Sequence, residues 1–312
     1  MGFGASAQLS AVKPRHPYID IHVHLGVFYW GREVTLDGLL RWMDEQGVER
    51  ATILPLVSPE ATCYLQTTEA ALAAYRRFPE RIIPFCCIDP RSMAPAPSTF
   101  PPAPHPRSSH VAGLKGMIAV LQRWKEMGAR GLGEHKVGLP IDHPLMMMLY
   151  EACQTVELPV LFHLDDIRCI DEVGFPHLQK VLETFPRLPL IGHECGFWAG
   201  ISGDCTPEDL HGYPKRPVVP GGAIDRLMAA HPNLYCDLSG PGGVGAFQRD
   251  PQFGRQFLLR WSDRILFGTD YLAPGQEIPH FGFFESLELP DDVRYKIYRG
   301  NAIRLLKLDL AS

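Results

Sequence analysis

The sequence contains no apolar run long enough to cross a membrane and no excess of positive charge. A membrane-spanning helix needs about 20 consecutive apolar residues, and every apolar run in this chain is shorter than that. The 30 lysines and arginines are outnumbered by 35 aspartates and glutamates, which gives a formal net charge of −5. A protein that binds nucleic acid usually presents a basic face. We therefore expect no membrane and no nucleic-acid partner.

The chain also lacks a C-x-x-C pair, although it has eight cysteines. Cys86 and Cys87 are adjacent, so on a strand their side chains would point to opposite faces. The chain is long and its cysteine spacing suggests no disulfide framework, which predicts reduced, mostly buried thiols in a cytoplasmic protein. Residues 1–17 contain no apolar run typical of a secretory signal and are expected to form a flexible lead-in.

Eight short apolar runs alternate with longer segments at helical spacing. The apolar runs are 18–25, 51–57, 81–89, 129–134, 158–164, 188–193, 233–239 and 264–270. The helical candidates are 36–47, 67–78, 114–127, 143–157, 174–185, 222–231, 252–261 and 291–307. Near-continuous apolar strands are typical of a parallel sheet covered on both faces, and parallel neighbours need helical crossovers. The pattern predicts an α/β fold, a (β/α)8 TIM barrel over residues 18–312 as a single domain; a doubly wound open sheet is the alternative.

Two insertions interrupt this rhythm. Residues 90–113 are rich in proline, serine and alanine, and residues 194–220 follow the sixth strand. Both are expected to be long loops at the carboxyl ends of strands, where barrel enzymes build their active sites. Loops of this length usually act as lids or walls, with disorder as the alternative.

Polar side chains end several of the predicted strands. His22 and His24 end the first strand, His163 the fifth, His193 the sixth and Asp270 the eighth. Alternate residues of a strand face the same side, so the first two imidazoles suit a zinc-type ion with Zn–N bonds of about 2.0–2.1 Å. Each residue alone could be an ordinary hydrogen-bonded residue or a helix cap. Together they indicate a site, because polar residues that end apolar strands are costly unless they are used.

The segments IDIHVHLG, PVLFH, LIGH, NLYCDLSG, RILFGTDYL and GNAIRLL resemble the amidohydrolase superfamily, over about residues 18–307. More narrowly they resemble its amidohydrolase-2-type branch, which includes aminocarboxymuconate-semialdehyde decarboxylase-like enzymes and lactonases. The resemblance implies a metal site at the carboxyl end of the barrel strands. It implies His22, His24, His163 and Asp270 as ligands of one divalent ion, with His193 in or beside the site. Zinc is the first expectation, manganese or iron the alternatives, at one or two ions per chain.

Glu134 ends the fourth predicted strand in the segment GLGEHK. This segment is similar to one in related metal-dependent DNases, in which such a glutamate is a ligand. The similarity implies that Glu134 bridges two ions and that His193 helps to hold the second. The alternative is a glutamate paired with Lys136 or Arg130 at the barrel rim.

The resemblance implies a metal-dependent hydrolase that acts on a small, anionic ester, lactone or amide. Asp270 would be the general base for the attacking water, and His193 would orient or polarise the substrate carbonyl. A non-oxidative metal-dependent decarboxylase on the same scaffold is the alternative. A nuclease is suggested only by the segment around Glu134, and the acidic charge balance argues against it.

The substrate is expected to be a small molecule held near the mouth of the barrel. Lys136 and Arg168 lie in segments predicted at the mouth, where they would bind a carboxylate or phosphate; ordinary surface charges are the alternative. Trp30 and Trp198 follow the first and sixth strands and would wall a pocket, with packing under a loop as the alternative. A homodimer is a candidate assembly, because barrels of this type commonly dimerise.

Overall fold

The computed structural model of the chain describes residues 16–29, 31–62, 64–93 and 106–310. Residues 1–15 of the predicted lead-in lie outside this range, and so does Trp30. The strands are β1 (Tyr18–Val23), β2 (Gly26–Tyr29), β3 (Arg32–Val34), β4 (Val48–Ile53), β5 (Ile82–Pro84), β6 (Leu132–His135), β7 (Val160–His163), β8 (Leu190–His193), β9 (Leu234–Asp237) and β10 (Ile265–Leu266). All but β2 and β3, which form an antiparallel hairpin, pair in parallel.

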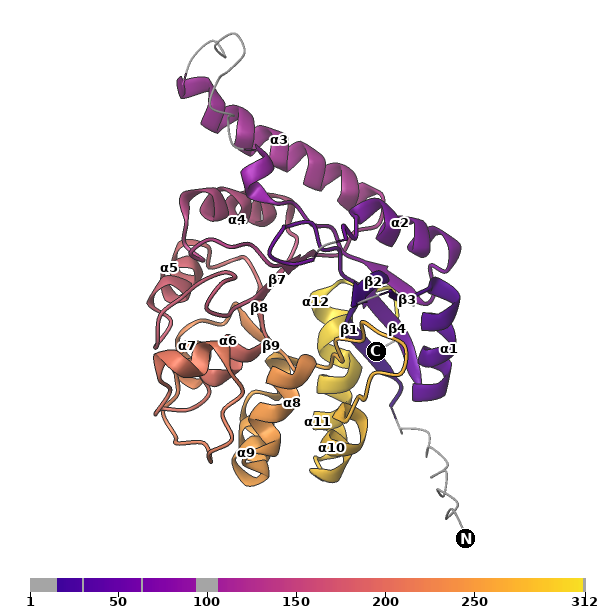
Figure 1. Cartoon of the computed structure of the whole chain (residues 1–312), viewed down its shortest axis with the longest axis vertical. Coiled ribbons are helices and arrows are strands. Elements are labelled where there is room, and N and C mark those ends of the chain that lie inside the picture. The colour runs from indigo at the N-terminus through magenta and orange to yellow at the C-terminus, as the bar shows by residue number, and fades with distance from the viewer. Residues whose placement is uncertain (1–15, 30, 63, 94–105, 311–312) are drawn as a thin grey trace.

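Helices surround these strands (Figure 1). They are α1 (Leu36–Gln46), α2 (Thr68–Arg77), α3 (Pro106–Glu126), α4 (Pro144–Val156), α5 (Pro176–Thr184), α6 (Cys195–Ala199), α7 (Ala223–Ala230), α8 (Gly240–Gln248), α9 (Pro251–Arg260), α10 (His280–Ser286), α11 (Asp291–Tyr295) and α12 (Asn301–Leu305). Short 3-10 turns lie at Pro90–Met93, Pro207–His211 and Ser262–Arg264, and a π-helical turn lies at Lys296–Gly300. Within the described ranges, no helix has the length and apolar character that a membrane span needs.

The parallel strands form two sheets, in the orders β1-β4-β5 and β10-β9-β8-β7-β6. Parallel bridges join the sheets at both edges, between Cys86 and Leu132 and between Val23 and Tyr271. Backbone hydrogen bonds strengthen the second junction, including one of 3.0 Å from His24 N to Tyr271 O. Each of the eight predicted apolar runs overlaps one of these parallel strands, and the strands follow one another in space in chain order. The predicted alternation of strands and helices is therefore confirmed.

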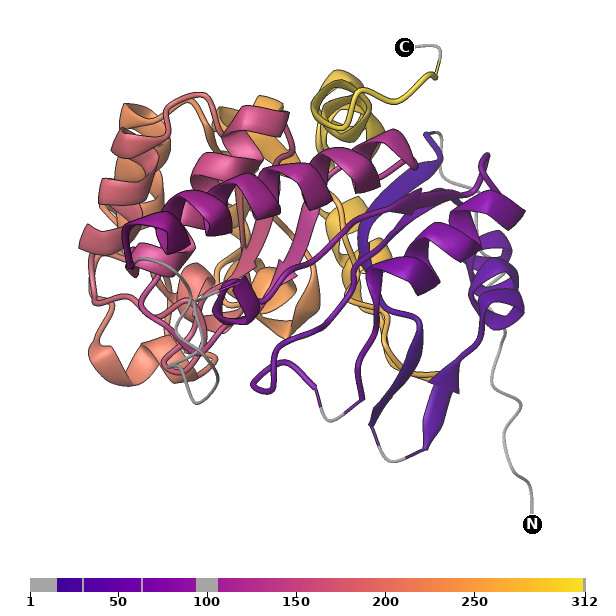
Figure 2. The same cartoon turned by 90° about the horizontal axis from the view of Figure 1, so that it is seen from above.

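Two groups of buried side chains form the core. The inner core cluster joins strands of both sheets to the C-terminal segment: Ile19, Ile21, Leu54, Ile83, Phe85, Leu161, Ile191, Leu266, Ala302, Leu306 and Leu308. The outer core cluster lies between strands and helices and includes Val23, Leu132, Val160, Leu190, Leu39 and Leu149. Figure 2 shows α12 lying across one end of the strands, where its residues complete the inner core cluster.

The two predicted long loops are partly helical, which corrects their assignment. Residues 90–93 form a 3-10 turn and α3 begins at Pro106, eight residues before the predicted helix. Residues 194–220 contain α6 and a second 3-10 turn, which Thr206 and Asp209 stabilise as a capping box. Proline is favourable in the first turn of a helix, because its fixed φ suits that position and its missing N–H has no partner there. Pro90, Pro106 and Pro207 therefore each begin a helix or a 3-10 turn within these segments.

Helix α8 was not predicted because its sequence, GPGGVGAFQ, has low helix propensity. Close packing requires Gly242 and Gly243. A Cβ atom on Gly242 would lie 2.7 Å from the carbonyl carbon of Glu194, and one on Gly243 would lie 2.1 Å from Leu238 O. Tertiary packing against the backbone of neighbouring strands and turns thus overrides local propensity here.

The described cysteines are free, as predicted, and all but Cys205 are buried.

His135, at the end of β6, is also buried, with its Nε2 atom 3.0 Å from Met146 Sδ. Burial lowers the pKa of His135 from 6.5 to about 4. The folded protein therefore holds this ring neutral in mildly acidic solution.

We expect His135 to make stability fall with falling pH. Below pH 6.5 the unfolded chain binds a proton at this histidine, while the folded chain binds it only near pH 4. The free energy of unfolding of the wild type, relative to a His135→Leu variant, should therefore decrease by about 2 kcal/mol between pH 7 and pH 5. Urea denaturation of both proteins at each pH measures this difference. Parallel pH curves for the two proteins would contradict the assignment.

Candidate metal centre

His22 and His24 face the site because strand β1 is irregular. Ile19 and Ile21 belong to the inner core cluster, whereas Val23 belongs to the outer one. A regular strand would place all three side chains on one face. The register of β1 against β4 shifts within this stretch, and such a shift moves the following side chains to the opposite face. Both histidines thereby follow the two isoleucines on the inner side.

The Asp20 carboxylate holds this irregularity in place. Its Oδ1 atom accepts hydrogen bonds of 3.0 Å from the backbone N–H groups of His22 and Thr269, and its Oδ2 atom accepts one of 2.6 Å from the Thr269 hydroxyl. Burial raises the pKa of Asp20 to about 7, although these hydrogen bonds oppose the shift. Asp20 therefore ties the end of β1 to the segment that carries Asp270.

Four donor atoms from three segments converge beyond these strands. The Nε2 atoms of His22 and His24 lie 3.2 Å apart. Asp270 Oδ1 lies 3.5 and 3.4 Å from these two atoms, and Glu134 Oε2 lies 3.7 and 3.4 Å from them. Ligands arranged tetrahedrally around an ion, with bonds of about 2.0–2.2 Å, are about 3.3–3.6 Å apart. The spacing of His22, His24 and Asp270 fits one divalent ion, and Glu134 Oε2 lies within a similar range of both rings.

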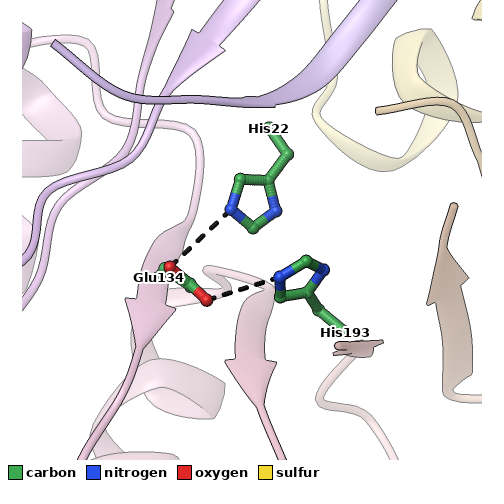
Figure 3. A group of neighbouring side chains, drawn as sticks. All are labelled: His22, Glu134 and His193. Carbon is green, nitrogen blue, oxygen red and sulfur yellow. Dashed lines mark ion pairs between the residues drawn. The ribbon is translucent and has the colours of Figure 1, made fainter. Parts of the chain in front are cut away.

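Glu134 also joins this group to a second one. Figure 3 shows its carboxylate facing the rings of both His22 and His193. Its Oε1 atom lies 3.5 Å from His193 Nε2, and its Oε2 atom lies 3.0 Å from Lys136 Nζ. The ligand atoms of His22, His24 and Asp270 all lie within 4.8 Å of one another, and so do those of His22, Glu134 and His193. The geometry thus brings together five of the six predicted ligands.

His163 does not belong to either group. Its Nδ1 atom lies 2.7 Å from Glu134 Oε1, and its Nε2 atom lies 2.9 Å from Asp165 Oδ2. Both ring nitrogens therefore face carboxylates. This arrangement differs from the predicted role of His163 as a direct ligand, because no nitrogen of the ring points toward the cluster of His22, His24 and Asp270.

Asp237 is a site residue that the sequence interpretation did not single out. It ends β9, and its Oδ2 atom lies 2.7 Å from His22 Nδ1 and 3.2 Å from His193 Nδ1. The Ser239 hydroxyl donates to the same oxygen at 2.5 Å. A carboxylate that accepts from one ring nitrogen fixes the tautomer and leaves the other nitrogen free for a ligand. The signal was present, because Asp237 is a polar residue that ends an apolar run.

Three buried polar atoms around Gly240 have no hydrogen-bond partner within the described residues: His193 Nε2, Glu194 Oε2 and Asp270 Oδ1. Buried polar atoms are normally paired. Gly240 has a φ of +71°, and a Cβ atom there would lie 2.7 Å from Glu194 Oε2 and 3.5 Å from Asp270 Oδ2. The missing side chain keeps space open beside these groups. One nitrogen and two carboxylate oxygens without hydrogen bonds suit a cation and the oxygen ligands around it.

The site concentrates negative charge. Burial opposes ionisation of Glu134, but Lys136 and His163 hold the pKa of its carboxyl well below the usual value. Burial would lower the pKa of His22, yet Asp270 and Asp237 raise it well above its ordinary value. Without an ion, a proton on His22 balances these carboxylates. A divalent cation can take the place of that proton, so the residues present fit a metal.

The predicted substrate-binding cations lie at the edge of this cluster. Lys136 Nζ is buried and lies 5.5 Å from the centre of the Phe28 ring. Arg168 forms an ion pair with Asp165 through Nη1 and donates from Nε to Glu60 O at 2.8 Å. Both cations therefore have protein partners, and each retains further donors.

Trp198 is buried and lines a small cavity between α6 and α8, so its role as a wall of the substrate pocket stays a prediction. Its side chain is 1% exposed. Its Nε1 atom donates to Asp237 O at 2.9 Å, and its ring makes an edge contact with Phe247 at 5.0 Å between centroids. The tryptophan follows the sixth strand on helix α6, whose residues are all buried, so it supports the site from the core.

Comparison with known proteins places this geometry in a family. An amidohydrolase family model matches residues 19–308, and comparison with curated proteins found no match. An uncharacterised TIM-barrel protein from Bordetella bronchiseptica is 17% identical with a TM-score of 0.61, covering 93% of this chain and 98% of its own. A protein provisionally named 2-pyrone-4,6-dicarboxylic acid hydrolase, from Pseudomonas putida, is 16% identical with a TM-score of 0.61, covering 95% and 100%.

A third similar structure is a dihydroxybenzoic acid decarboxylase from Polaromonas, solved with bound manganese and the inhibitor 2-nitroresorcinol. It is 17% identical with a TM-score of 0.56, and the match covers 95% of this chain and 98% of that one. At these identities the three structures support the TIM-barrel type of fold. Because the family model spans nearly all the described residues, the chain belongs to the amidohydrolase family.

Proposed function

We propose that this amidohydrolase-family enzyme is a metal-dependent hydrolase of a small, carboxylate-bearing ester, lactone or amide. The observation that carries the proposal is the pair of Nε2 atoms of His22 and His24, 3.2 Å apart, with Asp270 Oδ1 and Glu134 Oε2 each 3.4–3.7 Å from both of them. Such a set of nitrogen and oxygen donors is typical of zinc, and also suits manganese or iron.

His22, His24 and Asp270 would hold one ion, with Glu134 as the fourth donor. His193, on the other oxygen of Glu134, would complete a site for a second ion. His163 would orient Glu134 through its 2.7 Å contact rather than bind an ion itself. When bound, a divalent ion lowers the pKa of a water and polarises a substrate oxygen.

Asp270 would act as the general base of the reaction. Burial opposes its ionisation, but His22 and His24 lower the pKa of its carboxyl, so it is anionic at neutral pH. Its Oδ2 atom borders the space beside Gly240, from which it can accept a proton from water. His193 Nε2, buried and without a hydrogen bond, can donate to or orient a carbonyl oxygen in the same space.

Lys136 and Arg168 would bind an anionic group of the substrate. Burial opposes a charge on Lys136, but Glu134 and Asp270 raise its pKa, so it stays cationic. Arg168 lies near enough to affect that pKa. Two similar structures, under 20% identical, bear the names of proteins that act on a pyrone dicarboxylate and a dihydroxybenzoic acid, both carboxylated rings. A carboxylated ring is therefore the first substrate class to test.

Non-oxidative decarboxylation of a ring carboxylate is the second candidate, favoured by the similarity to decarboxylases. In that reaction the bond between the ring carbon and the carboxylate breaks, carbon dioxide leaves, and the ring carbon gains a proton. Asp270 or His193 would deliver that proton. The same donor set would serve both reactions, so only the products separate them.

The deciding experiment is a screen of the purified, metal-loaded protein. The panel contains carboxylated lactones, N-acyl amino acids and hydroxylated aromatic carboxylates, each beside its uncharged methyl ester or amide. Acid release and carbon dioxide release are followed in parallel. Hydrolysis of a carboxylated lactone or amide, with its uncharged partner at least about 10-fold slower, supports the proposal. Carbon dioxide release without hydrolysis would assign the second candidate, and faster turnover of the uncharged partners would refute the role of Lys136 and Arg168.

A further inference from the structure

A second polar site lies outside the metal centre, in a cavity between α6, α8 and residues 212–215. We propose that this cavity binds a small anion, either a halide or a single carboxylate group, through the guanidinium of Arg249. Its lining residues are Cys195, Trp198, Ala199, Gly212, Tyr213, Pro214, Lys215, Pro241, Gly242, Gly245, Ala246 and Arg249.

The side chain of Arg249 is the reason for the proposal. Its Nε, Nη1 and Nη2 atoms are all buried and have no hydrogen-bond partner among the residues that the structure describes. A guanidinium carries five N–H donors in a fixed plane. Leaving a charged donor group buried and unpaired is among the most costly arrangements in a protein. The arginine therefore requires a partner that the described residues do not supply.

The nearby carboxylates are already used elsewhere. Asp204 and Asp209 both bind Arg216, at 2.8 Å to its Nε and 2.5 Å to its Nη2 respectively. Asp250, the next residue in the chain, accepts from the backbone N–H of Phe253 at 3.1 Å and caps α9. None of these carboxylates makes an ion pair with Arg249.

The electrostatic surroundings of Arg249 leave its charge uncompensated. Burial, followed by the neighbouring Arg216, lowers the pKa of Arg249, and the attraction of Asp204 and Asp209 does not reverse the shift. A water molecule in the cavity would accept hydrogen bonds but would carry no charge. An anion provides both acceptors and the opposite charge. The exposed Lys215 on the same wall adds a second positive charge.

The size and walls of the cavity limit what it can hold. Its volume is about 20 Å³, and about 10–15 Å³ on this measure holds one water molecule. Glycine, alanine, proline and tryptophan form much of the wall. The space therefore suits a small anion, such as a halide or the two oxygens of one carboxylate.

The cavity also adjoins the metal centre. Tyr213 lines the cavity, and its hydroxyl donates to Oε1 of Glu194, whose other oxygen is one of the atoms without a hydrogen bond beside Gly240. An anion on Arg249 would lie beneath the segment that carries Tyr213. Binding in the cavity would therefore steady the contact between Tyr213 and Glu194.

Bromide tests the proposal, because its anomalous X-ray scattering identifies it. Crystals of the full chain soaked in sodium bromide should show an anomalous peak in hydrogen-bond range of the Arg249 guanidinium, and crystals of Arg249→Gln should show none there. In solution, bromide at several times its dissociation constant should raise the wild-type Tm by about 2–4 °C over sodium sulfate at equal ionic strength. The Arg249→Gln protein should lose this difference, while a variant of the exposed Arg187, Arg187→Gln, should keep it.

Two further arms separate the sources of the anion. If sodium formate removes the bromide peak, the site accepts carboxylate groups; if formate leaves the peak in place, the site is selective for halides. Either result supports an anion site. An absent peak in wild-type crystals, together with an equal Tm difference in wild type and Arg249→Gln, would overturn the proposal. This test needs no substrate, so its outcome is independent of the proposed hydrolase activity.

Discussion

Replacing His22 and His24 together by alanine is expected to remove the metal from the purified protein. The wild type should carry at least about one zinc, manganese or iron ion per chain, and the double variant less than about a tenth of one. The two rings supply adjacent donors 3.2 Å apart, and their loss leaves Asp270 and Glu134 without the nitrogens that a zinc-type ion prefers. Elemental analysis after dialysis against a metal-free buffer measures the content.

The variant should also lose the stabilisation that the ion provides. An ion present at 1,000 times its dissociation constant stabilises the folded state by about 4 kcal/mol, so the wild type should unfold at a lower temperature after chelation and the double variant should not respond. His177 and His211 form the matched control pair, because they are partly or largely exposed and face Asp142 and Asp166. A double variant that keeps its metal would refute the site.

Asp270→Asn is expected to keep the fold and to reduce turnover about 10²–10⁴-fold, the usual effect of removing a general base. Asp270 has a φ of +57°, and asparagine is one of the few side chains that tolerate this conformation. The substitution keeps the shape of the side chain and removes its ability to accept a proton. The rate is measured with the substrate that the panel identifies.

Metal analysis of Asp270→Asn must accompany the rate, because Asp270 also contributes a donor atom. Full metal content with lost turnover would assign Asp270 as the base; loss of both would assign it chiefly as a ligand. A fully active variant would contradict both roles. Asp142→Asn is the matched control, because Asp142 is a partly buried carboxylate that pairs with Lys180 and His177 on the outer surface.

The sequence predicted the strands and most of the site because both depend on local patterns. Each apolar run ends near a polar residue, and parallel strands of one ring bring their carboxyl ends together. This reasoning located His22, His24, Glu134, His193 and Asp270. It could not show that β1 is irregular near Asp20, although that irregularity decides which face carries the histidines.

The remaining differences arise from tertiary contacts. His163 ends a strand like the other predicted ligands, but its partner Glu134 lies in β6, 29 residues earlier in the chain, and no spacing rule predicts that contact. Helix α8 forms although its glycine-rich sequence has low helix propensity. The backbone around Glu194 leaves no room for a side chain at Gly242, so glycine is needed there. The position of Trp198 just after the sixth strand suggested a pocket wall. Its burial depends on packing against α8 and α9, which the sequence pattern does not show.

The junction between Val23 and Tyr271 joins the first strand to the segment that follows the last. The donors His22 and His24 therefore meet Asp270 only after the ring has been assembled from its two ends. During synthesis on the ribosome the histidines emerge early and the aspartate late. The nascent chain lacks the complete set of ligands during most of its translation. We therefore expect the metal to bind after the chain is released from the ribosome.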